Sequence, residues 1–295
     1  MRTPIRITIT FAIFFTASTP ALQTRCASPA PPSQSLPQAA TSPRTYLGFD
    51  RNDYPGDAAM AKLAPEFAFT GYWLNGPPGE TATNWTGKRA VIQSDGFGFV
   101  ILFNGRLDKQ LKSVARATIL GEGDADSAVS AALREGFPKG AIIFLDQEEG
   151  GRLLPEQNAY LFSWVDELTS EGFRPGVYCS GIPAPDGPGK FIVTADDIKQ
   201  HEGRRNISFF VYNDACPPSP GCAGAGDPSP PSASGTTFAV VWQFSQSPVR
   251  PEYAKACRST YAKDGFCYPP GQSAQNPVYV DMDSASSADP SAARQ

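Results

Sequence analysis

Short runs of apolar residues recur along the chain, and most are apolar along their whole length rather than at alternate positions. Strands of this kind are buried on both faces, which is typical of parallel strands covered by helices. Eight such runs predict a closed α/β barrel rather than an open sheet. We predict strands over residues 45–49, 68–74, 98–103, 141–145, 176–179, 207–212, 238–244 and 278–280.

Helical patterns separate several of these runs. Residues 155–171 carry apolar side chains at spacings of three and four, and Gly172 follows them as a helix stop. Residues 124–135 predict a second helix, with Asp124 as its cap. The stretches 212–238 and 244–278 are rich in Pro, Gly, Ser and Cys instead. The sequence therefore predicts a TIM-like (β/α) barrel whose last strands lack regular helices.

The two ends of the chain have other compositions. Arg2 and Arg6 precede the apolar run 7–17, which small residues follow, and this order indicates a secretory signal peptide within residues 1–28. Cleavage is expected after Ala21, with sites near Ala27 or Ala30 as alternatives. Residues 29–44 are rich in Pro, Ala and Ser and predict a linker. The barrel is expected over 45–283, and residues 284–295 are predicted to form a disordered tail.

Export sets the expected location and partners. The apolar run is too short to span a membrane, so we expect no integral segment after cleavage and a secreted, periplasmic or cell-envelope protein. Lipidation of Cys26 is less favoured, because residues 23–25 lack the small apolar side chains usual before a lipidated cysteine. A net charge of −4 and a pI near 5.2 argue against a nucleic-acid partner. We expect a monomer.

Four cysteines lie in the Pro/Gly-rich stretches. In an oxidising compartment the simplest pairing is local, Cys216 with Cys222 and Cys257 with Cys267, although four cysteines allow three arrangements. Zinc is the competing interpretation. It is disfavoured because no pair has the spacing of a zinc knuckle and the chain has a single histidine. We therefore expect neither a metal nor a cofactor.

Carboxylates follow several predicted strands. Asp50 ends the first, Asp146 and Glu148 end the fourth, and Asp281 follows the last. In a parallel barrel these strand ends meet at one mouth, which holds the active site. Asp283 shares the face of Asp281 and could take its place, but we favour Asp281.

Asp146 and Glu148 are two residues apart on an extended segment, so both point to the same face. Crowding and partial burial raise the pKa of at least one such carboxyl. A carboxyl that stays protonated near neutral pH is the general acid that glycosidic cleavage requires. The alternative is that these carboxylates cap loops or bind a cation. Glu149 should point to the opposite side.

Short motifs occur in one order along the chain: GFD at 48–50, LDQE at 145–148, GVY at 176–178, WQ at 242–243 and VD at 280–281. This order resembles that of the glycoside hydrolase family 25 lysozymes, and more closely that of the uncharacterised glycoside-hydrolase-like domains related to them. The resemblance implies a barrel whose last strands lack helices. It also implies cleavage of the β-1,4 bond between N-acetylmuramic acid and N-acetylglucosamine in peptidoglycan.

Carried over by position, the resemblance makes Glu148 the general acid. Asp146 then orients or stabilises the reacting sugar through its acetamido group. Asp50 and Asp281 would tune the pKa of Glu148 and position substrate or water. The resemblance also suggests substrate-binding side chains, with Trp242 as a stacking wall: Tyr178, Tyr212, Trp242 and Gln243. Trp73, at the end of the second predicted strand, lies in either the core or the cleft and is the fifth candidate.

Three functions remain open at this point. The first is a secreted hydrolase of peptidoglycan or a related amino-sugar polymer. The second is a non-catalytic, glycan-binding envelope protein that uses the same acidic cleft. The third is a structural envelope protein without a ligand.

Overall fold

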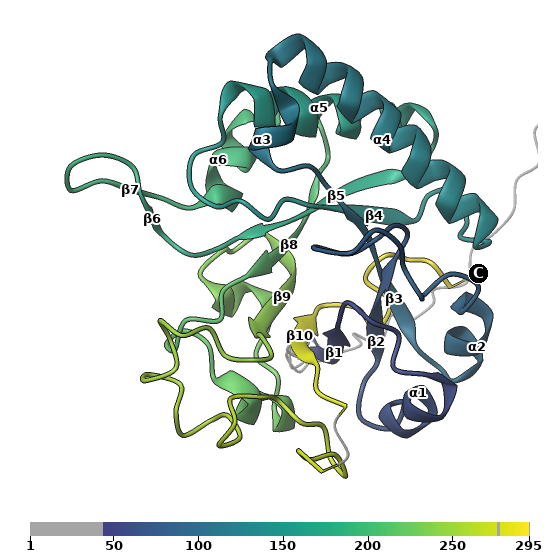
Figure 1. Ribbon diagram of the computed structural model, residues 1–295, viewed down its shortest axis with the longest axis vertical. Helices are drawn as coiled ribbons and strands as arrows, with labels where there is room; N and C mark the ends of the chain where they lie inside the picture. Colours follow the sequence, from purple (N-terminus) through teal and green to yellow (C-terminus); the bar gives the residue numbers. More distant parts are fainter. Residues whose placement is uncertain (1–43, 276–277, 295) are drawn as a thin grey trace, which may run out of the picture. The chain divides into compact units, whose positions relative to one another are not determined.

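In the computed structural model, which describes residues 44–275 and 278–294, eight strands close a barrel in the order β1-β10-β9-β8-β5-β4-β3-β2 (Figure 1). This confirms the predicted α/β barrel. The predicted signal peptide and nearly all of the linker lie outside the described residues, as do residues 276, 277 and 295. The barrel strands are β1 (Tyr46–Asp50), β2 (Phe69–Trp73), β3 (Gly98–Asn104), β4 (Ile142–Asp146), β5 (Arg174–Ser180), β8 (Ser208–Tyr212), β9 (Ala239–Ser245) and β10 (Asp281–Ala285).

Helices cover only part of the barrel, and the last two strands are joined by loops (Figure 1). No helix in the described part of the chain is long and apolar enough to cross a membrane. The helices are α1 (Asp57–Leu63), α2 (Arg89–Ser94), α3 (Asp108–Leu111), α4 (Val114–Arg134), α5 (Pro155–Ser170) and α6 (Thr194–His201). A two-stranded hairpin, β6 (Ala184–Pro185) and β7 (Phe191–Ile192), projects between β5 and α6.

Strand β10 differs from its prediction in position and direction. It begins at Asp281 rather than at residue 278, and it runs antiparallel to both β1 and β9, whereas the other barrel pairs are parallel. A parallel strand needs a crossover, usually a helix, that returns the chain to the opposite end of the sheet. The described part of the segment after β9 forms no helix, and the chain re-enters the barrel at the mouth where β9 ended. The first residue of β10 therefore lies beside the last residue of β1.

Helix α5 matches its prediction, but α4 is much longer than expected. It begins after Ser113, whose hydroxyl accepts a hydrogen bond from the Arg116 amide, and Asp124 lies in its interior. Two glycines before Asp124 made the earlier turns unconvincing. Gly121 has a packing role instead, because a Cβ there would lie 2.1 Å from the Ser163 Oγ of α5. Close contact between two helices outweighs the low helix propensity of the glycine.

The C-terminal residues are ordered against the barrel, so the prediction of a disordered tail is wrong for residues 284–294. Strand β10 continues through Ala285. Beyond it, Ser291 accepts hydrogen bonds from the Ile101 and Ile142 amides and donates its own amide to the Phe99 carbonyl. Small side chains indicated disorder, but here they allow the chain to lie against the starts of β3 and β4, where backbone groups need partners.

The loops after β8 and β9 contain only the short 3₁₀ turns η1 (Gly221–Gly226) and η2 (Pro231–Ser234) in their described parts, as expected. The local disulfide pairing is wrong. Cys216 is bonded to Cys257 and Cys222 to Cys267, with 5.4 Å between the Cα atoms of each pair. Each bond joins one loop to the other, because the two loops pack together over β9. The remaining described cysteine, Cys179, is buried in β5.

Candidate active site

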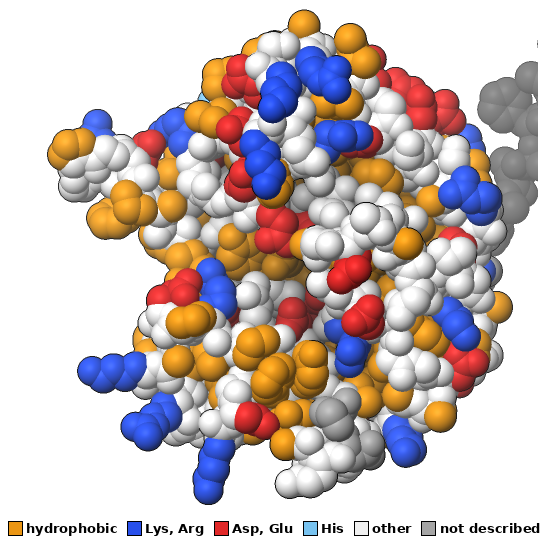
Figure 2. All heavy atoms as spheres, in the orientation of Figure 1, with side chains coloured by type: hydrophobic (Ala, Val, Ile, Leu, Met, Phe, Trp, Pro, Cys, Tyr) orange, Lys and Arg blue, Asp and Glu red, His pale blue; other side chains and the backbone are white. Residues whose placement is uncertain are grey.

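A pocket of about 350 Å³ opens at the carboxyl ends of the parallel strands. Acidic side chains lie inside the central hollow of the surface shown in Figure 2. The four predicted carboxylates, Asp50, Asp146, Glu148 and Asp281, all line it. Four of the five predicted substrate-binding residues line it as well, namely Trp73, Tyr178, Tyr212 and Gln243.

Asp146 lies at the floor of this pocket, at the end of β4. Its side chain is only 3% exposed, and neither carboxylate oxygen receives a hydrogen bond from an N–H or O–H group of the described residues. Burial, and then the charge of the adjacent Glu148, raise the pKa of Asp146 well above its ordinary value. Asp146 is therefore expected to keep its proton and to donate it in a hydrogen bond to Glu148.

Glu148 lies just beyond the strand and remains accessible to solvent within the pocket. The pocket walls remove part of its hydration, which raises its pKa, while the hydrogen bond with Asp146 acts in the opposite direction. Two carboxyls in contact share protons as a unit. The pair therefore holds a proton at a pH where isolated carboxyls would both be ionised.

A second group of carboxyls lies where β1 meets β10. Asp50 pairs in register with Asp281, and Asp283 lies opposite Gly48, two pairs deeper in the barrel. Burial raises the pKa of Asp50 to about 6, although hydrogen bonds with Gln243 and Asp283 counteract it. Burial also raises the pKa of Asp281 well above its usual range. Gly71 provides the space for this group, because a Cβ there would lie 2.7 Å from the Cβ of Asp50.

Asp283 belongs to the group although it does not line the pocket. It is 0% exposed, and no described N–H or O–H group donates to its oxygens. Burial and the nearby charge of Asp50 raise its pKa well above the usual value, so Asp283 is expected to keep its proton beside Asp50. The signal for it was present in the sequence, since Asp281 and Asp283 are two residues apart on one strand. The two residues act at different depths rather than as alternatives.

Gln243 of β9 connects the two sides of the mouth. Its amide nitrogen donates to Asp50 at 2.7 Å and to Asp281 at 3.5 Å. Its carbonyl oxygen accepts from the Tyr178 hydroxyl at 2.8 Å and from the Gln246 amide at 2.9 Å. Burial raises the pKa of Tyr178 further above its ordinary value, which keeps this phenol a donor. Gln243 thus orients the carboxylates as well as lining the pocket.

Trp242 does not line the pocket, so its predicted role as a stacking wall is wrong. Side chains alternate along a strand, and Gln243 occupies the inward position. Trp242 therefore points outward, where it is 1% exposed and packs against Phe244 with ring centroids 5.6 Å apart. Its indole N–H donates to the Asn213 carbonyl at 3.0 Å. Trp73, which was predicted to lie in either the core or the cleft, lies against the pocket.

The segment after β4 that carries Glu148 is anchored at several points. Glu149 faces away from the pocket, as its position predicted. Its carboxylate accepts hydrogen bonds from the Asp108 amide at 2.7 Å and from the Gln157 side chain at 2.8 Å. It therefore joins this segment to the starts of α3 and α5.

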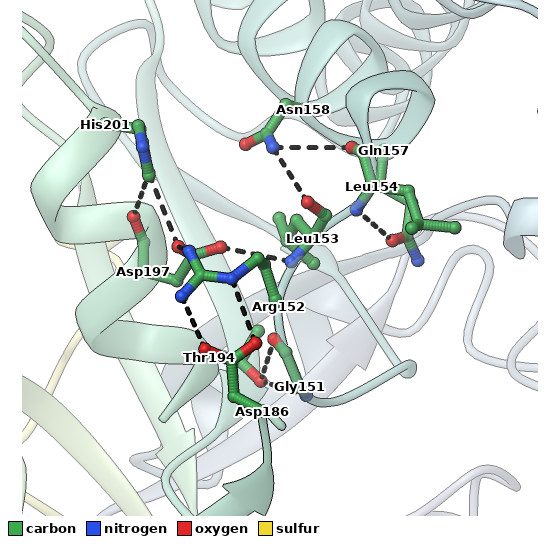
Figure 3. Close-up of polar contacts among 10 residues, drawn as sticks. All are labelled: Gly151, Arg152, Leu153, Leu154, Gln157, Asn158, Asp186, Thr194, Asp197 and His201. Atoms are coloured by element: carbon green, nitrogen blue, oxygen red, sulfur yellow. Dashed lines mark hydrogen bonds and ion pairs between the residues drawn. The ribbon is translucent and has the colours of Figure 1, made fainter. Parts of the chain in front are cut away.

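A second anchor lies a few residues further along and joins the same segment to α6 and the β6–β7 hairpin (Figure 3). The Gly151 amide donates to the Thr194 hydroxyl at 2.7 Å, and that hydroxyl donates back to the Gly151 carbonyl. Arg152 pairs with Asp186 of the hairpin loop and with buried Asp197 of α6. Sequence reasoning missed these residues because their partners are distant in the chain.

Arg250 is the one basic side chain among the described residues that line the pocket, and sequence reasoning also missed it. It lies in the loop after β9, where no periodic pattern distinguishes it from other charged residues. Its guanidinium pairs with the fully buried Asp214, with an Nε–Oδ2 distance of 2.9 Å. Within the described residues, no group of three or more His, Cys, Asp or Glu side chains is arranged to hold a metal ion.

Comparison with known families covers the helix-rich part of the barrel. Residues 75–184, from the end of β2 to the start of the hairpin, match the model of the Rv2525c-like, glycoside hydrolase-like domain. The match includes Asp146, Glu148 and Tyr178 and leaves out Asp50, Gln243 and Asp281. No curated protein sequence matches the chain significantly.

Solved structures resemble the chain over most of its length. An uncharacterized protein of B. stearothermophilus is 18% identical, with a TM-score of 0.50 over 81% of this chain and 94% of that one. The Tat-secreted protein Rv2525c of Mycobacterium tuberculosis, in complex with L-tartrate, is 14% identical, with a TM-score of 0.45 over 82% and 95%. The catalytic domain of endolysin ply40, from bacteriophage P40 of Listeria monocytogenes, is 14% identical, with a TM-score of 0.46 over 84% and 96%. The strand order of the closed barrel gives the chain an α/β barrel fold, and residues 75–184 are similar to a glycoside hydrolase-like domain.

Proposed function

We propose that the chain is an exported glycoside hydrolase that cleaves β-1,4 bonds in peptidoglycan or a related amino-sugar polymer. Glu148 is the general acid and Asp146 assists it. The observation that carries this proposal is the pair itself, a buried carboxyl beside an accessible one at the floor of an open pocket, both with raised pKa values.

The two members of the pair suit different roles. A general acid must reach the leaving-group oxygen of the substrate, and Glu148 alone of the two is accessible to solvent. Asp146 holds its proton more firmly because it is buried. Both carboxyls have raised pKa values, and in the doubly protonated pair Glu148 can give its proton to the leaving oxygen. The hydrogen bond from Asp146, which keeps its own proton, then stabilises the new Glu148 carboxylate. In this proposal Asp146 also contacts the acetamido group of the reacting sugar.

The second carboxyl group would act on the other side of the sugar. Asp50 and Asp281 line the pocket and share Gln243 as a donor, so their oxygens are held in fixed positions. With a pKa of about 6, Asp50 is mostly ionised at neutral pH and can accept a hydrogen bond from a sugar hydroxyl or from water. Trp73, Tyr178 and Tyr212 provide aromatic surface of the kind that packs against sugar rings.

The test is to incubate the purified protein with purified cell walls and to measure new reducing ends. We expect release by the wild-type protein and a loss of about 100- to 10,000-fold in Glu148→Gln. Glu122→Gln is the matched control, because Glu122 is exposed on α4 away from the pocket and should leave the rate unchanged. Equal release by wild type and Glu148→Gln would refute the proposal.

The same assay separates hydrolysis from glycan binding alone. A non-catalytic protein would be retained on insoluble peptidoglycan, in both its wild-type and Glu148→Gln forms, and would release no reducing ends. That result would assign the cleft to recognition instead of cleavage.

A further inference from the structure

Arg250 introduces a positive side chain into a pocket whose other described lining residues are acidic, amide, aromatic or aliphatic. The pocket places it with Tyr212 on one wall, while four carboxyl side chains line the rest of the cavity. The guanidinium lies over the Tyr212 ring at 5.6 Å and over the Tyr253 ring at 4.7 Å. None of the roles in the proposed hydrolysis requires a cation at this position, so Arg250 needs a separate explanation.

The guanidinium is held in place before any ligand binds. Its Nε and Nη2 atoms face the two carboxylate oxygens of Asp214, which is fully buried. Asp214 lies two residues before Cys216, and the disulfide from Cys216 to Cys257 closes the same corner of the two loops. A fixed guanidinium loses less conformational entropy when it binds a ligand than a free arginine side chain does.

Part of the guanidinium remains available. The Arg250 side chain is 28% exposed, and Asp214 occupies only the edge formed by Nε and Nη2. The remaining nitrogen, Nη1, lies 3.6 Å from the exposed carboxylate of Glu252, a distance too long for a direct hydrogen bond. A planar guanidinium has five N–H donors, so it can bind a second carboxylate while it keeps the first.

We propose that Arg250 binds a carboxylate of the glycan, and so selects polymers in which a sugar carries an acidic substituent. This inference rests on the proposed function and names its substrate class. Negative charge on Asp50, which is mostly ionised at neutral pH, and the oxygen atoms of the other carboxyls disfavour a substrate carboxylate on the floor of the pocket. The acidic sugar must therefore lie at the Arg250 wall. That requirement sets which bond of the polymer is presented to Glu148.

Two kinds of carboxylate fit this chemistry, the lactyl group of muramic acid and the ring carboxylate of a uronic acid. The experiment measures by calorimetry the Kd of two ligands for the full protein with Glu148→Gln, which prevents cleavage. One ligand is the disaccharide of N-acetylglucosamine and N-acetylmuramic acid, and the other is the same disaccharide with its carboxylate converted to an amide. A hyaluronan tetrasaccharide, in which uronic acid supplies the carboxylate, tests the second source.

Amidation of the ligand removes a charge-assisted hydrogen bond to Arg250, so it should weaken binding about 10- to 100-fold. The double variant Arg250→Gln with Asp214→Asn removes both charges, so no buried carboxylate is left unpaired, and it should bind the acid and the amide equally. Lys255→Gln is the matched control, because Lys255 is exposed on the same loop and does not line the pocket. This variant should prefer the acid over the amide to the same extent as the Glu148→Gln protein.

Equal binding of acid and amide by the parent protein, or no binding of any of these glycans, would overturn the role of Arg250. If cell walls are nevertheless cleaved, the proposed hydrolase stands. A different outcome would separate the two proposals. If the Glu148→Gln protein binds the acid more tightly than the amide, the double variant does not, and the wild-type protein fails to cleave cell walls, the role of Arg250 stands and hydrolysis is refuted. Tighter binding of the tetrasaccharide than of the disaccharide would identify uronic acid as the preferred source.

Discussion

Two sides of the barrel are held together in different ways. The helix-covered side consists of β2–β5 with α2, α4 and α5. The loop-covered side consists of β8–β10 with the loops after β8 and β9. On the first side, helices bury apolar faces against strands, as α5 does with Trp164 and Leu168. On the second, two disulfides join the loops, and pairs such as Arg250 with Asp214 connect them. Both sides contribute residues to one pocket, although apolar packing stabilises the first side and disulfides and ion pairs stabilise the second.

The contributions themselves differ in kind. The helix-covered side supplies Asp146 and Glu148, on a strand and a segment anchored to α3, α5 and α6. The loop-covered side supplies Gln243, Asp281 and Arg250, the groups that orient and charge the other wall. Chemistry therefore lies with the regular half of the barrel in our proposal, and selection of the substrate with the irregular half.

The largest expected effect is the loss of a disulfide from the loop-covered side. Replacing Cys216 and Cys257 by alanine removes a cross-link between two residues that are 41 positions apart in the sequence. The free energy of unfolding should therefore fall by about 4 kcal/mol. Hydrogen exchange should increase first in the two loops and leave α4 and α5 protected. Cys179→Ala, on the helix-covered side, should cost less because Cys179 forms no disulfide. Uniform loss of protection across both sides would contradict the comparison.

The next effect concerns stability and pH. Asp50 and Asp283 have raised pKa values, so the folded protein holds protons that the unfolded chain releases above about pH 4. The free energy of unfolding should therefore fall as the pH rises from 4 through 6, by about 3 kcal/mol for Asp50 alone. Asp283→Asn should raise stability at pH 7 by about 1–3 kcal/mol and change it little at pH 4. Thermal melts at both pH values measure this, and destabilisation at pH 7 would refute it.

A smaller effect tests the connection between the two sides. Gln243→Leu removes the hydrogen bond that counteracts the rise in the pKa of Asp50, so that pKa should increase. The acid limb of the pH–rate profile should move toward higher pH, and the rate at its optimum should fall about 10-fold. Gln246→Leu keeps the bonds to Asp50 and Tyr178 and provides the control. An unchanged profile would show that Gln243 has no influence on Asp50.

The smallest effect compares two tryptophans. Trp73 and Trp242 are both buried, and each donates its indole N–H to a backbone carbonyl, of Arg51 and Asn213 respectively. Phenylalanine at either position should cost about 1 kcal/mol of stability. Only Trp73→Phe should change KM on cell walls, because only Trp73 lines the pocket. A change in KM for Trp242→Phe would contradict its outward position.

Much of the helix-covered side could be predicted because its signals are local. The fully apolar run before Asp146 indicated a buried strand, and the alternation of side chains placed Glu148 on the same face. The apolar spacing of residues 155–171 gave α5 within one residue. The exception was α4, which contains Gly121 and Gly123 in its interior; Gly121 packs against α5.

The loop-covered side could be predicted only in outline. The composition of the loops indicated that they lack long helices. It did not indicate which cysteines form disulfides, because the bonded cysteines are 41 and 45 residues apart. The direction of β10 followed from where the preceding loop lies in space. Trp242 was misplaced because its motif was transferred as a unit, although adjacent residues on a strand face opposite ways.

The sequence by itself determined a barrel of buried strands and the position of Asp146 and Glu148 at one strand end. Both follow from periodicity within a few residues, where the backbone dictates which way a side chain points. Only the tertiary structure decided that Asp146 is buried while Glu148 stays accessible, that Asp283 lies beneath Asp50, and that Arg250 reaches the same pocket. Burial and the charges nearby depend on packing between segments far apart in the chain, and these set the pKa of each carboxyl.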